Sequence, residues 1–195
     1  VVDLSVGQEA AWAGFESRAR NMVRKSEKAG VVSRTLHPNE EWTAEYYTML
    51  SETFERKGRA VPHPYSFYRA LVPFVENGDA HVVGAFHQGK MVSGAIFLLD
   101  GRRILLLSAA SKPEAMKVAG SSSVQWHAIS EAIATGFEEY DMGGLGVPLI
   151  DTFKRSFGGR DLVHHRWVYQ SRLFRTMEPF ARWALNRGWL RLGGS

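Results

Sequence analysis

The sequence predicts an α/β fold in which helices flank a mixed and mostly antiparallel sheet. Helical spacing of apolar residues dominates residues 8–78, and three apolar runs separated by the turn-forming pairs Gln88-Gly89 and Asp100-Gly101 follow in residues 80–111. Such runs are typical of a meander of antiparallel hairpins. A helix and then a strand follow in residues 122–142. A helix between two strands is typical of a parallel crossover, so the three patterns together predict the mixed sheet.

Helices and one short strand are expected before the meander. Residues 8–29 form an amphipathic pattern with Arg20, Arg24 and Lys28 on one face. The opposite face carries the apolar residues Trp12, Phe15, Ala19, Met22 and Val23. Gly30 is a C-cap candidate before a short strand at 31–36. A second helix over 39–57 starts at the N-cap candidate Asn39, and a third over 66–78 contains Pro73, which we expect to kink it.

Helices and strands alternate after the meander. A loop rich in Lys, Gly and Ser follows residue 111, and a helix is expected over 122–136. A strand over 137–142, a helix over 148–157 and a strand over 162–170 come next. A basic, aromatic helix over 174–192 is expected to end the sequence, and it either packs on the sheet or lies on a membrane surface.

Length and composition favour a single domain over residues 1–195. Of the 195 residues, 45% are hydrophobic, which is enough to bury a core without disulfides. Cysteine is absent, which favours a reducing compartment, and the expected location is cytoplasmic. The longest apolar run, residues 91–99, is far shorter than the ~18 residues of a membrane-spanning helix, so neither a membrane-spanning helix nor a signal peptide is expected.

The charge of the chain is distributed unevenly. The formal net charge is +4, and from residue 154 onward nine Lys and Arg residues face two acids. Residues 15–34 form a second basic region. This distribution favours a protein that gathers an anionic substrate, such as a phosphate-bearing molecule or an RNA end; a solvated basic surface without a ligand is equally common.

Spacing disfavours two kinds of catalytic site. The seven histidines include no His-Glu-x-x-His motif and no pair at helical i, i+4 spacing, so no metal site is expected. The serines of residues 121–123 lack the Gly-x-Ser-x-Gly elbow of a nucleophilic serine and are better explained as helix caps.

Residues 141–160, DMGGLGVPLIDTFKRSFGGR, contain the strongest candidates. Gly143 and Gly144 stand between a strand and a helix, where backbone amides can hold an anion, but the run lacks both the dinucleotide fingerprint and the P-loop motif. Lys154 lies at the edge of an apolar helical face. That face consists of Ile150, Phe153 and Phe157. A cation held beside packed aromatics is suited to stabilise an oxyanion, and a lysine that snorkels to water is the alternative.

Three segments together resemble the Fem-type aminoacyltransferases, GNAT-like enzymes that transfer amino acids from aminoacyl-tRNA to peptidoglycan precursors. Residues 20–31 (RNMVRKSEKAGV) are similar to the family's Arg-x-x-Ile-Arg-Lys helix. Residues 124–144 (VQWHAISEAIATGFEEYDMGG) resemble its helix, glycine and Asp-x-Gly-Gly strand end, and residues 153–159 (FKRSFGG) its Phe-Lys-x-x-Phe-Gly motif. The resemblance implies a GNAT-like (acyl-CoA N-acyltransferase-like) fold. Family members usually contain two such domains and this chain resembles the second, so we expect either an additional N-terminal domain or a compact relative that acts alone or as a homodimer.

The resemblance also implies roles for individual residues. Lys154 matches the motif lysine near the reacting centre and is expected to stabilise negative charge on the tetrahedral intermediate. Asp141 is expected either to orient the attacking amine or to cap the turn. Substrate contacts are expected from Arg20, Arg24, Arg56, Arg59, Phe153, Phe157, Gly143 and Gly144. Arg56 or Arg59 is expected to contact a phosphate, and the two phenylalanines to hold the segment.

Three functions remain open. The first is an aminoacyltransferase that takes aminoacyl-tRNA as co-substrate, without a cofactor, and acts on the amine of an anionic, phosphate-bearing or lipid-linked acceptor; a peripheral location at the inner membrane face is then expected. The second is an acyl-CoA-dependent N-acetyltransferase whose pyrophosphate loop comprises Lys117, Gly120 and Ser122. The third is a non-catalytic domain that binds RNA or another anion. DNA is not an expected partner.

Overall fold

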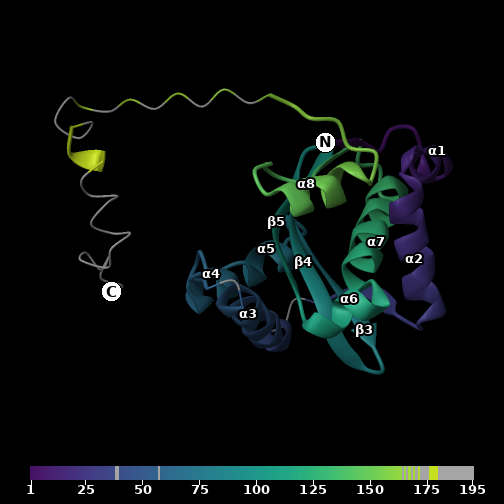
Figure 1. Cartoon of the computed structure of the whole chain (residues 1–195), viewed down its shortest axis with the longest axis horizontal. Helices are drawn as coiled ribbons and strands as arrows, with labels where there is room; N and C mark the ends of the chain where they lie inside the picture. The colour runs from purple at the N-terminus through teal and green to yellow at the C-terminus, as the bar shows by residue number, and fades with distance from the viewer. Residues whose placement is uncertain are drawn as a thin grey trace. The chain divides into compact units, whose positions relative to one another are not determined.

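The computed structural model describes residues 1–37, 40–56, 58–163, 165, 167, 169, 171 and 176–179 (Figure 1). The chain divides into two units, Val1–Asp161 and Leu162–Ser195, and each is described by itself. The sequence predicts a single domain over residues 1–195. In the structure, the sheet and the helices that cover it lie in the first unit. Within the described part of the chain, no helix has the length and apolar character needed to cross a membrane.

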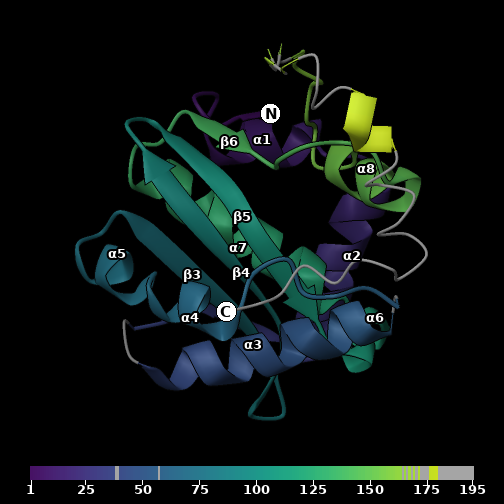
Figure 2. The ribbon, with the colours of Figure 1, turned by 90° about the vertical axis from the view of Figure 1, so that its left-hand side faces the viewer.

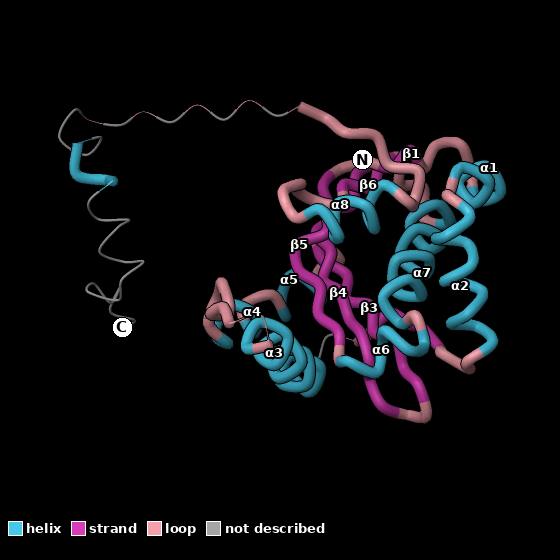
Figure 3. Tube along the Cα trace, in the orientation of Figure 1, coloured by secondary structure: helices cyan, strands magenta, loops and turns pink. Residues whose placement is uncertain are grey.

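A six-stranded sheet forms the centre of the first unit (Figures 2 and 3). Its strands are β1 (Val2–Asp3), β2 (Val32–Thr35), β3 (Ala80–His87), β4 (Lys90–Asp100), β5 (Arg103–Ser111) and β6 (Glu139–Asp141). Their order across the sheet is β1-β6-β5-β4-β3-β2. All neighbours are antiparallel except β5 and β6, which are parallel and joined by a helical crossover. The mixed, mostly antiparallel sheet expected from the sequence is therefore confirmed.

Helices cover both faces of this sheet (Figure 1). One face is covered by α3 (Glu40–Glu55), α4 (Tyr65–Arg69) and α5 (Val72–Glu76). The other side carries α1 (Gln8–Gly14), α2 (Ser17–Lys28) and α7 (Gly120–Ala134). The short helix α6 (Pro113–Val118) follows β5, and α8 (Pro148–Arg155) follows β6. A sheet with two apolar faces needs such a layer on each side.

Neighbouring residues of the central strands belong to two separate cores. Val83 and Phe97 lie in the core beneath α2 and α7, whereas Val82 and Ile96 lie in the core beneath α3 and α4. Successive strand residues point to opposite faces of a sheet, so β3 and β4 are buried on both sides. This double burial explains why these strands read as nearly continuous apolar runs in the sequence.

The helix expected over residues 8–29 is two helices in the structure. α1 ends at Gly14, and Phe15 has extended backbone angles (φ −68°, ψ 145°) before α2 begins at Ser17. The guanidinium of Arg20 donates hydrogen bonds to the backbone carbonyls of Ala13 (3.1 Å) and Phe15. The last carbonyls of a helix lack partners within it, so Arg20 stabilises a break that helical periodicity alone does not reveal.

Other elements also differ from expectation. The helix expected over 66–78 is divided into α4 and α5 at Ala70 and Leu71, and Pro73 stands in the first turn of α5, where its missing N–H is not needed. The loop expected after residue 111 contains α6, which begins with Pro113. The sequence does not reveal β1, because a strand of two residues has no readable period.

In the second unit, the prediction of a strand over residues 162–170 is wrong for the residues that the structure describes there. Residues 162, 163, 165, 167 and 169 are in no strand. Residues 162–170 (LVHHRWVYQ) do not alternate apolar and polar side chains, so they lack the period of a half-buried strand. Residues 176–179 are helical, as expected for part of the helix over 174–192. The rest of that helix and the N-cap candidate Asn39 lie outside the described residues.

Candidate functional site

The two parallel strands separate after a short paired section. β5 pairs with β6 only as far as Leu105 and Asp141. The chain then stays beside β5 up to Gly143, where an added Cβ would lie 3.5 Å from the carbonyl oxygen of Leu106. Among the residues that the structure describes, 107–111 have no strand partner on this side of β5. The opening between the strands therefore leaves backbone N–H and C=O groups of β5 available to a ligand.

Lys154 extends from α8 to the edge of this opening. Its ammonium donates a hydrogen bond to the carbonyl oxygen of Gly144 (2.7 Å), and a Cβ added to Gly143 would lie 3.8 Å from Nζ. Burial lowers the pKa of Lys154, and the nearby carboxylates of Asp151 and Asp141 offset this effect only in part. The opening is thus bordered by a cation that is partly removed from water and lies beside two acids.

Two carboxylates shape the glycine turn that Lys154 contacts. Asp141 Oδ1 accepts the backbone N–H of Gly143 (2.8 Å). Asp151 accepts the backbone N–H of Gly146, at 3.0 Å through Oδ2 and 3.2 Å through Oδ1. Gly143 and Gly146 have φ of +75° and +143°, which favour glycine. The turn is therefore fixed by an acid at each end and by Lys154 in the middle.

Aromatic packing holds the segment that carries Lys154. Phe157 is 0% exposed and packs edge-to-face on Phe15 with 5.0 Å between ring centroids, and Phe153 packs on Phe157 at 5.2 Å. Phe157 is thus an anchor whose burial leaves no room for a substrate contact, whereas Phe153 is partly exposed. Ile150, expected on the same packed face, is 40% exposed, because the aromatic packing engages only the C-terminal end of α8.

The arginines expected to bind substrate lie in different places. Arg20 is occupied at the end of α1, and the Arg24 guanidinium lies over the ring of Trp12, 5.6 Å from its centroid. Arg56 donates to the carbonyl oxygen of Ser111 (2.9 Å), the last residue of β5. None of these contacts involves Lys154 or its glycine turn. Arg59 is exposed in the segment after α3.

Lys117, Gly120 and Ser122 lie where α6 meets α7. Lys117 is exposed in the last turn of α6. A Cβ added to Gly120 would lie 3.1 Å from Val92 Cγ2 and 3.3 Å from Ala115 Cβ, so this glycine allows α7 to approach β4 closely. Ser122 is 5% exposed, and its burial keeps the hydroxyl away from a bound phosphate in this conformation.

The structure brings Lys154, Asp141, Gly143 and Gly144 together at the opening and adds Asp151, which sequence reasoning did not single out. A signal for Asp151 was present, since it precedes Lys154 by three residues on a helix, a spacing at which side chains are neighbours. In the described ranges, no group of three or more His, Asp or Glu side chains is arranged to hold a metal ion.

Comparisons with known proteins identify the family and the fold. The sequence matches a family model described as an acetyltransferase (GNAT) domain over residues 13–155. No curated protein matches the chain significantly. Among solved structures, FemX aligns with a TM-score of 0.72 at 16% sequence identity over 80% of this chain. The alignment covers 57% of the FemX chain, so the present chain spans little more than half the length of that protein.

Two acetyltransferases align over nearly their whole length. The aminoglycoside acetyltransferase meta-AAC0020 from an uncultured soil metagenomic sample, in complex with sisomicin, has a TM-score of 0.57 and 15% identity over 72% of this chain and 97% of its own. The ribosomal-protein-alanine N-acetyltransferase of Brucella melitensis biovar Abortus 2308 has a TM-score of 0.52 and 14% identity over 72% of this chain and 99% of its own. At such identities the likeness shows the fold alone.

Proposed function

The chain belongs to the acetyltransferase (GNAT) domain family and is an acyltransferase, and from this premise we propose that it moves an aminoacyl group from aminoacyl-tRNA to an amine. Acceptors of the expected kind include a peptidoglycan precursor or a peptide natural product. The GNAT-like fold expected from the sequence is confirmed by the family match. One observation carries the proposal: the ammonium of Lys154 lies at the opening between β5 and β6, 2.7 Å from the carbonyl oxygen of Gly144.

Lys154 supplies the charge that the reaction needs. The attacking amine forms a C–N bond to the ester carbonyl carbon, and the carbonyl oxygen becomes negatively charged. Lys154 then exchanges the carbonyl of Gly144 for this oxygen and stabilises it, an effect that is strong in a site partly removed from water. The ester C–O bond breaks, and the proton lost by the amine passes to the departing ribose oxygen. No strong base is required, because the ester is already activated and positioning supplies much of the acceleration.

Asp141 and Arg56 support this reaction from two directions. Asp141 Oδ1 is engaged by Gly143, and we assign its second oxygen to the attacking amine. The Arg56 side chain contacts Ser111 at the C-terminal end of β5, about 17 Å along the strand from Leu106, and we assign it to a phosphate of the donor. Phe157 holds α8 in position from the core.

An acyl-CoA-dependent N-acetyltransferase is the second candidate. The description of the family model favours it, as does the alignment of meta-AAC0020 over 97% of its length. Of the loop expected to bind pyrophosphate, Lys117 is exposed, but Gly120 and Ser122 are buried. If acyl-CoA is the donor, its pyrophosphate therefore requires a different set of contacts at the same end of β5.

Parallel assays with the two donors test the proposal. The chain is incubated with charged tRNA or with acetyl-CoA and a panel of amines, and transfer is measured for the wild type and for Lys154→Ala. We expect transfer from charged tRNA that depends on Lys154. Transfer from acetyl-CoA alone supports the second candidate, and binding of tRNA without transfer from either donor supports a non-catalytic RNA-binding domain; either result contradicts the proposal.

A further inference from the structure

A row of three side chains crosses the sheet beside the opening. Leu105 of β5 is the register partner of Asp141 on β6 and of Leu98 on β4. Residues directly opposite on neighbouring strands point to the same face of a sheet, so these side chains are neighbours. Tyr140 and Phe97, which precede Asp141 and Leu98 in their strands, lie in the core beneath α2 and α7. The row therefore points to the opposite face, the one that carries α3, α4 and α5.

The two leucines of this row lie outside the part of the face that the helices cover. Leu98 and Leu105 are half-buried and belong to neither hydrophobic core of the described structure. Ile96 and Ala110, further along the same two strands, lie in the core beneath α3 and α4. Figure 2 looks onto this face and shows α3, α4 and α5 along one side of it. Leu105 and Leu98 thus form a partly exposed apolar strip, the leucine strip, that starts at Asp141.

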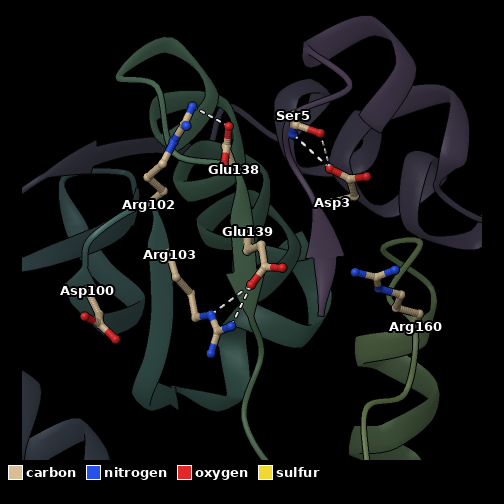
Figure 4. Close-up of a pocket in the computed structure, with 8 residues that line it drawn as sticks. All are labelled: Asp3, Ser5, Asp100, Arg102, Arg103, Glu138, Glu139 and Arg160. Carbon is tan, nitrogen blue, oxygen red and sulfur yellow. Dashed lines mark hydrogen bonds and ion pairs between the residues drawn. The ribbon is translucent and has the colours of Figure 1, made fainter.

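A charged pocket of about 560 Å³ borders the leucine strip at the start of β5 and β6 (Figure 4). It begins two residues before Leu105, where Arg103 donates to Glu139 Oε2 through Nε (2.9 Å) and Nη2 (2.8 Å). Its other lining residues are Asp3, Ser5, Asp100, Arg102, Glu138 and Arg160. An apolar chain along the strands would cover these charges and remove their water, which is costly. A chain across the strands, over the leucine strip, avoids this cost.

We propose that the leucine strip binds the carbon chain of the acceptor and that the acceptor is an amine at the end of an unbranched alkyl chain. The ammonium pairs with Asp141 Oδ2, since Oδ1 accepts the N–H of Gly143. Neighbouring strands are about 4.8 Å apart, so the strip ends about 10 Å from Asp141. At about 1.2 Å per bond of an extended chain, this length corresponds to about eight carbon atoms. The inference rests on the proposed function for the place of the amine.

The leucine strip also disfavours polar acceptors. Leucine side chains offer no hydrogen bond, so the hydroxyl groups of an aminosugar would lose water there without a replacement. A carboxylate at the far end of the chain would lie against Leu98 rather than against a cation. The same surface that favours an alkyl chain therefore selects against a sugar amine and against an ω-amino acid.

Binding of matched amines to the full chain, without any donor, tests this inference. Isothermal titration calorimetry is performed with butylamine, hexylamine, octylamine and decylamine, and with glucosamine and 8-aminooctanoate as polar probes. We expect each methylene up to octylamine to tighten binding about two- to fourfold, so that octylamine binds at least about tenfold more tightly than butylamine. Decylamine should gain little more, because its chain extends past Leu98. An affinity independent of chain length, or equal binding of octylamine and a polar probe, would overturn the proposal.

Variants show where the chain lies. Leu105→Thr and Leu98→Thr keep a β-branched residue suited to a strand and are each expected to reduce the gain from butylamine to octylamine at least about threefold. Asp141→Asn should weaken all alkylamines by a similar factor and leave this gain intact. Val32→Thr is the matched control, because Val32 is 62% exposed on β2 at the opposite edge of the sheet, and it should leave all affinities unchanged.

Thermal unfolding verifies that each variant is folded. A full gain with chain length in both leucine variants would show that the chain binds elsewhere, and unchanged affinities in Asp141→Asn would show that the amine does; either result contradicts the proposal. Because no donor is present, failure of acyl transfer leaves these results interpretable.

Discussion

Two short turns of the molecule look alike in sequence but have different structural roles. Both contain glycine at the start of a helix or just before one, and both were candidates to hold an anion: residues 117–122 where α6 meets α7 (the turn before α7) and residues 141–146 between β6 and α8 (the turn before α8). At Gly120 an added Cβ would lie 3.1 Å from a side chain of β4, whereas at Gly144 it would meet no atom within 4 Å. The first glycine therefore serves packing, and the second leaves room for a ligand beside Lys154.

The difference between the turns lies in what surrounds the missing side chain, and composition does not reveal this. In the turn before α7, Ser122 is buried with its neighbour Gly120. In the turn before α8, three backbone groups are held by Asp141, Asp151 and Lys154 while the turn remains exposed. A turn that is ordered by hydrogen bonds and still open to solvent is suited to function, whereas a turn ordered by packing mainly supports the fold.

Removal of Lys154 is expected to have the largest effect. Lys154→Ala deletes the cation at the opening, and we expect kcat to fall about 10²- to 10³-fold, as for the loss of one oxyanion donor. Steady-state kinetics with charged tRNA measure this fall in kcat. Arg155→Ala is the matched control, because the adjacent Arg155 pairs with Asp161 (2.8 Å) at the surface. An equal fall of kcat in both variants would show that charge on α8, rather than this ammonium, matters.

A side chain at Gly120 tests the packed turn. Gly120→Val places methyl groups against Val92 and Ala115, and overpacking of this kind costs about 1–3 kcal/mol of the free energy of unfolding. Urea denaturation measures this change. If the variant and the wild type have the same urea midpoint of unfolding, the turn before α7 is not tightly packed.

Asp151→Asn tests how the charge of Lys154 is maintained. Asp151 raises the pKa of Lys154 against the effect of burial, so its neutralisation is expected to lower that pKa further. Lys154 acts in its protonated form, and transfer is therefore lost as pH rises through its pKa, below the usual value of 10.5. The alkaline limb of the rate profile, corrected for donor hydrolysis, should move to lower pH in this variant. Asp161→Asn, at the other end of the segment, should leave the limb in place.

Alanine at the two adjacent glycines of the open turn is expected to have the smallest effects. Gly143 has φ of +75°, so Gly143→Ala costs about 1–2 kcal/mol of stability through backbone strain. Gly144 has open space around it, and Gly144→Ala is expected to change the free energy of unfolding by less than about 0.5 kcal/mol. Thermal or urea unfolding distinguishes the two variants. A larger loss of stability in Gly144→Ala than in Gly143→Ala contradicts the geometry of the turn.

Local patterns were sufficient to predict the central strands of the sheet but not the edge strand β1 or the helix boundaries. The meander was visible because apolar runs and their turn pairs are properties of adjacent residues. The break at Phe15 was not visible, because it is stabilised by Arg20 from the following helix. The strand expected over 162–170 is absent from the described residues there, and its apolar residues do not alternate with polar ones as those of a half-buried strand do.

Residues of the candidate site that belong to a sequence motif could be predicted. Residues whose position depends on tertiary packing could not. The Phe-Lys-x-x-Phe-Gly resemblance pointed to Lys154 before its contact with Gly144 was known. Burial of Ser122 depends on the approach of α7 to β4, which is set by tertiary packing rather than by sequence spacing. The charged pocket joins residues as distant in sequence as Asp3, Asp100 and Arg160, so no local pattern could have grouped them.

The central claim is that the ammonium of Lys154 stabilises the tetrahedral oxyanion, and binding of a transition-state analogue tests it most directly. The affinity of a phosphonate analogue of the aminoacyl ester is compared with that of an amide-linked, unreactive donor in the wild type and in Lys154→Ala. We predict that Lys154→Ala weakens the phosphonate about a hundredfold or more and the amide-linked donor less than about threefold. Equal weakening of both ligands, or of neither, would contradict this role of Lys154.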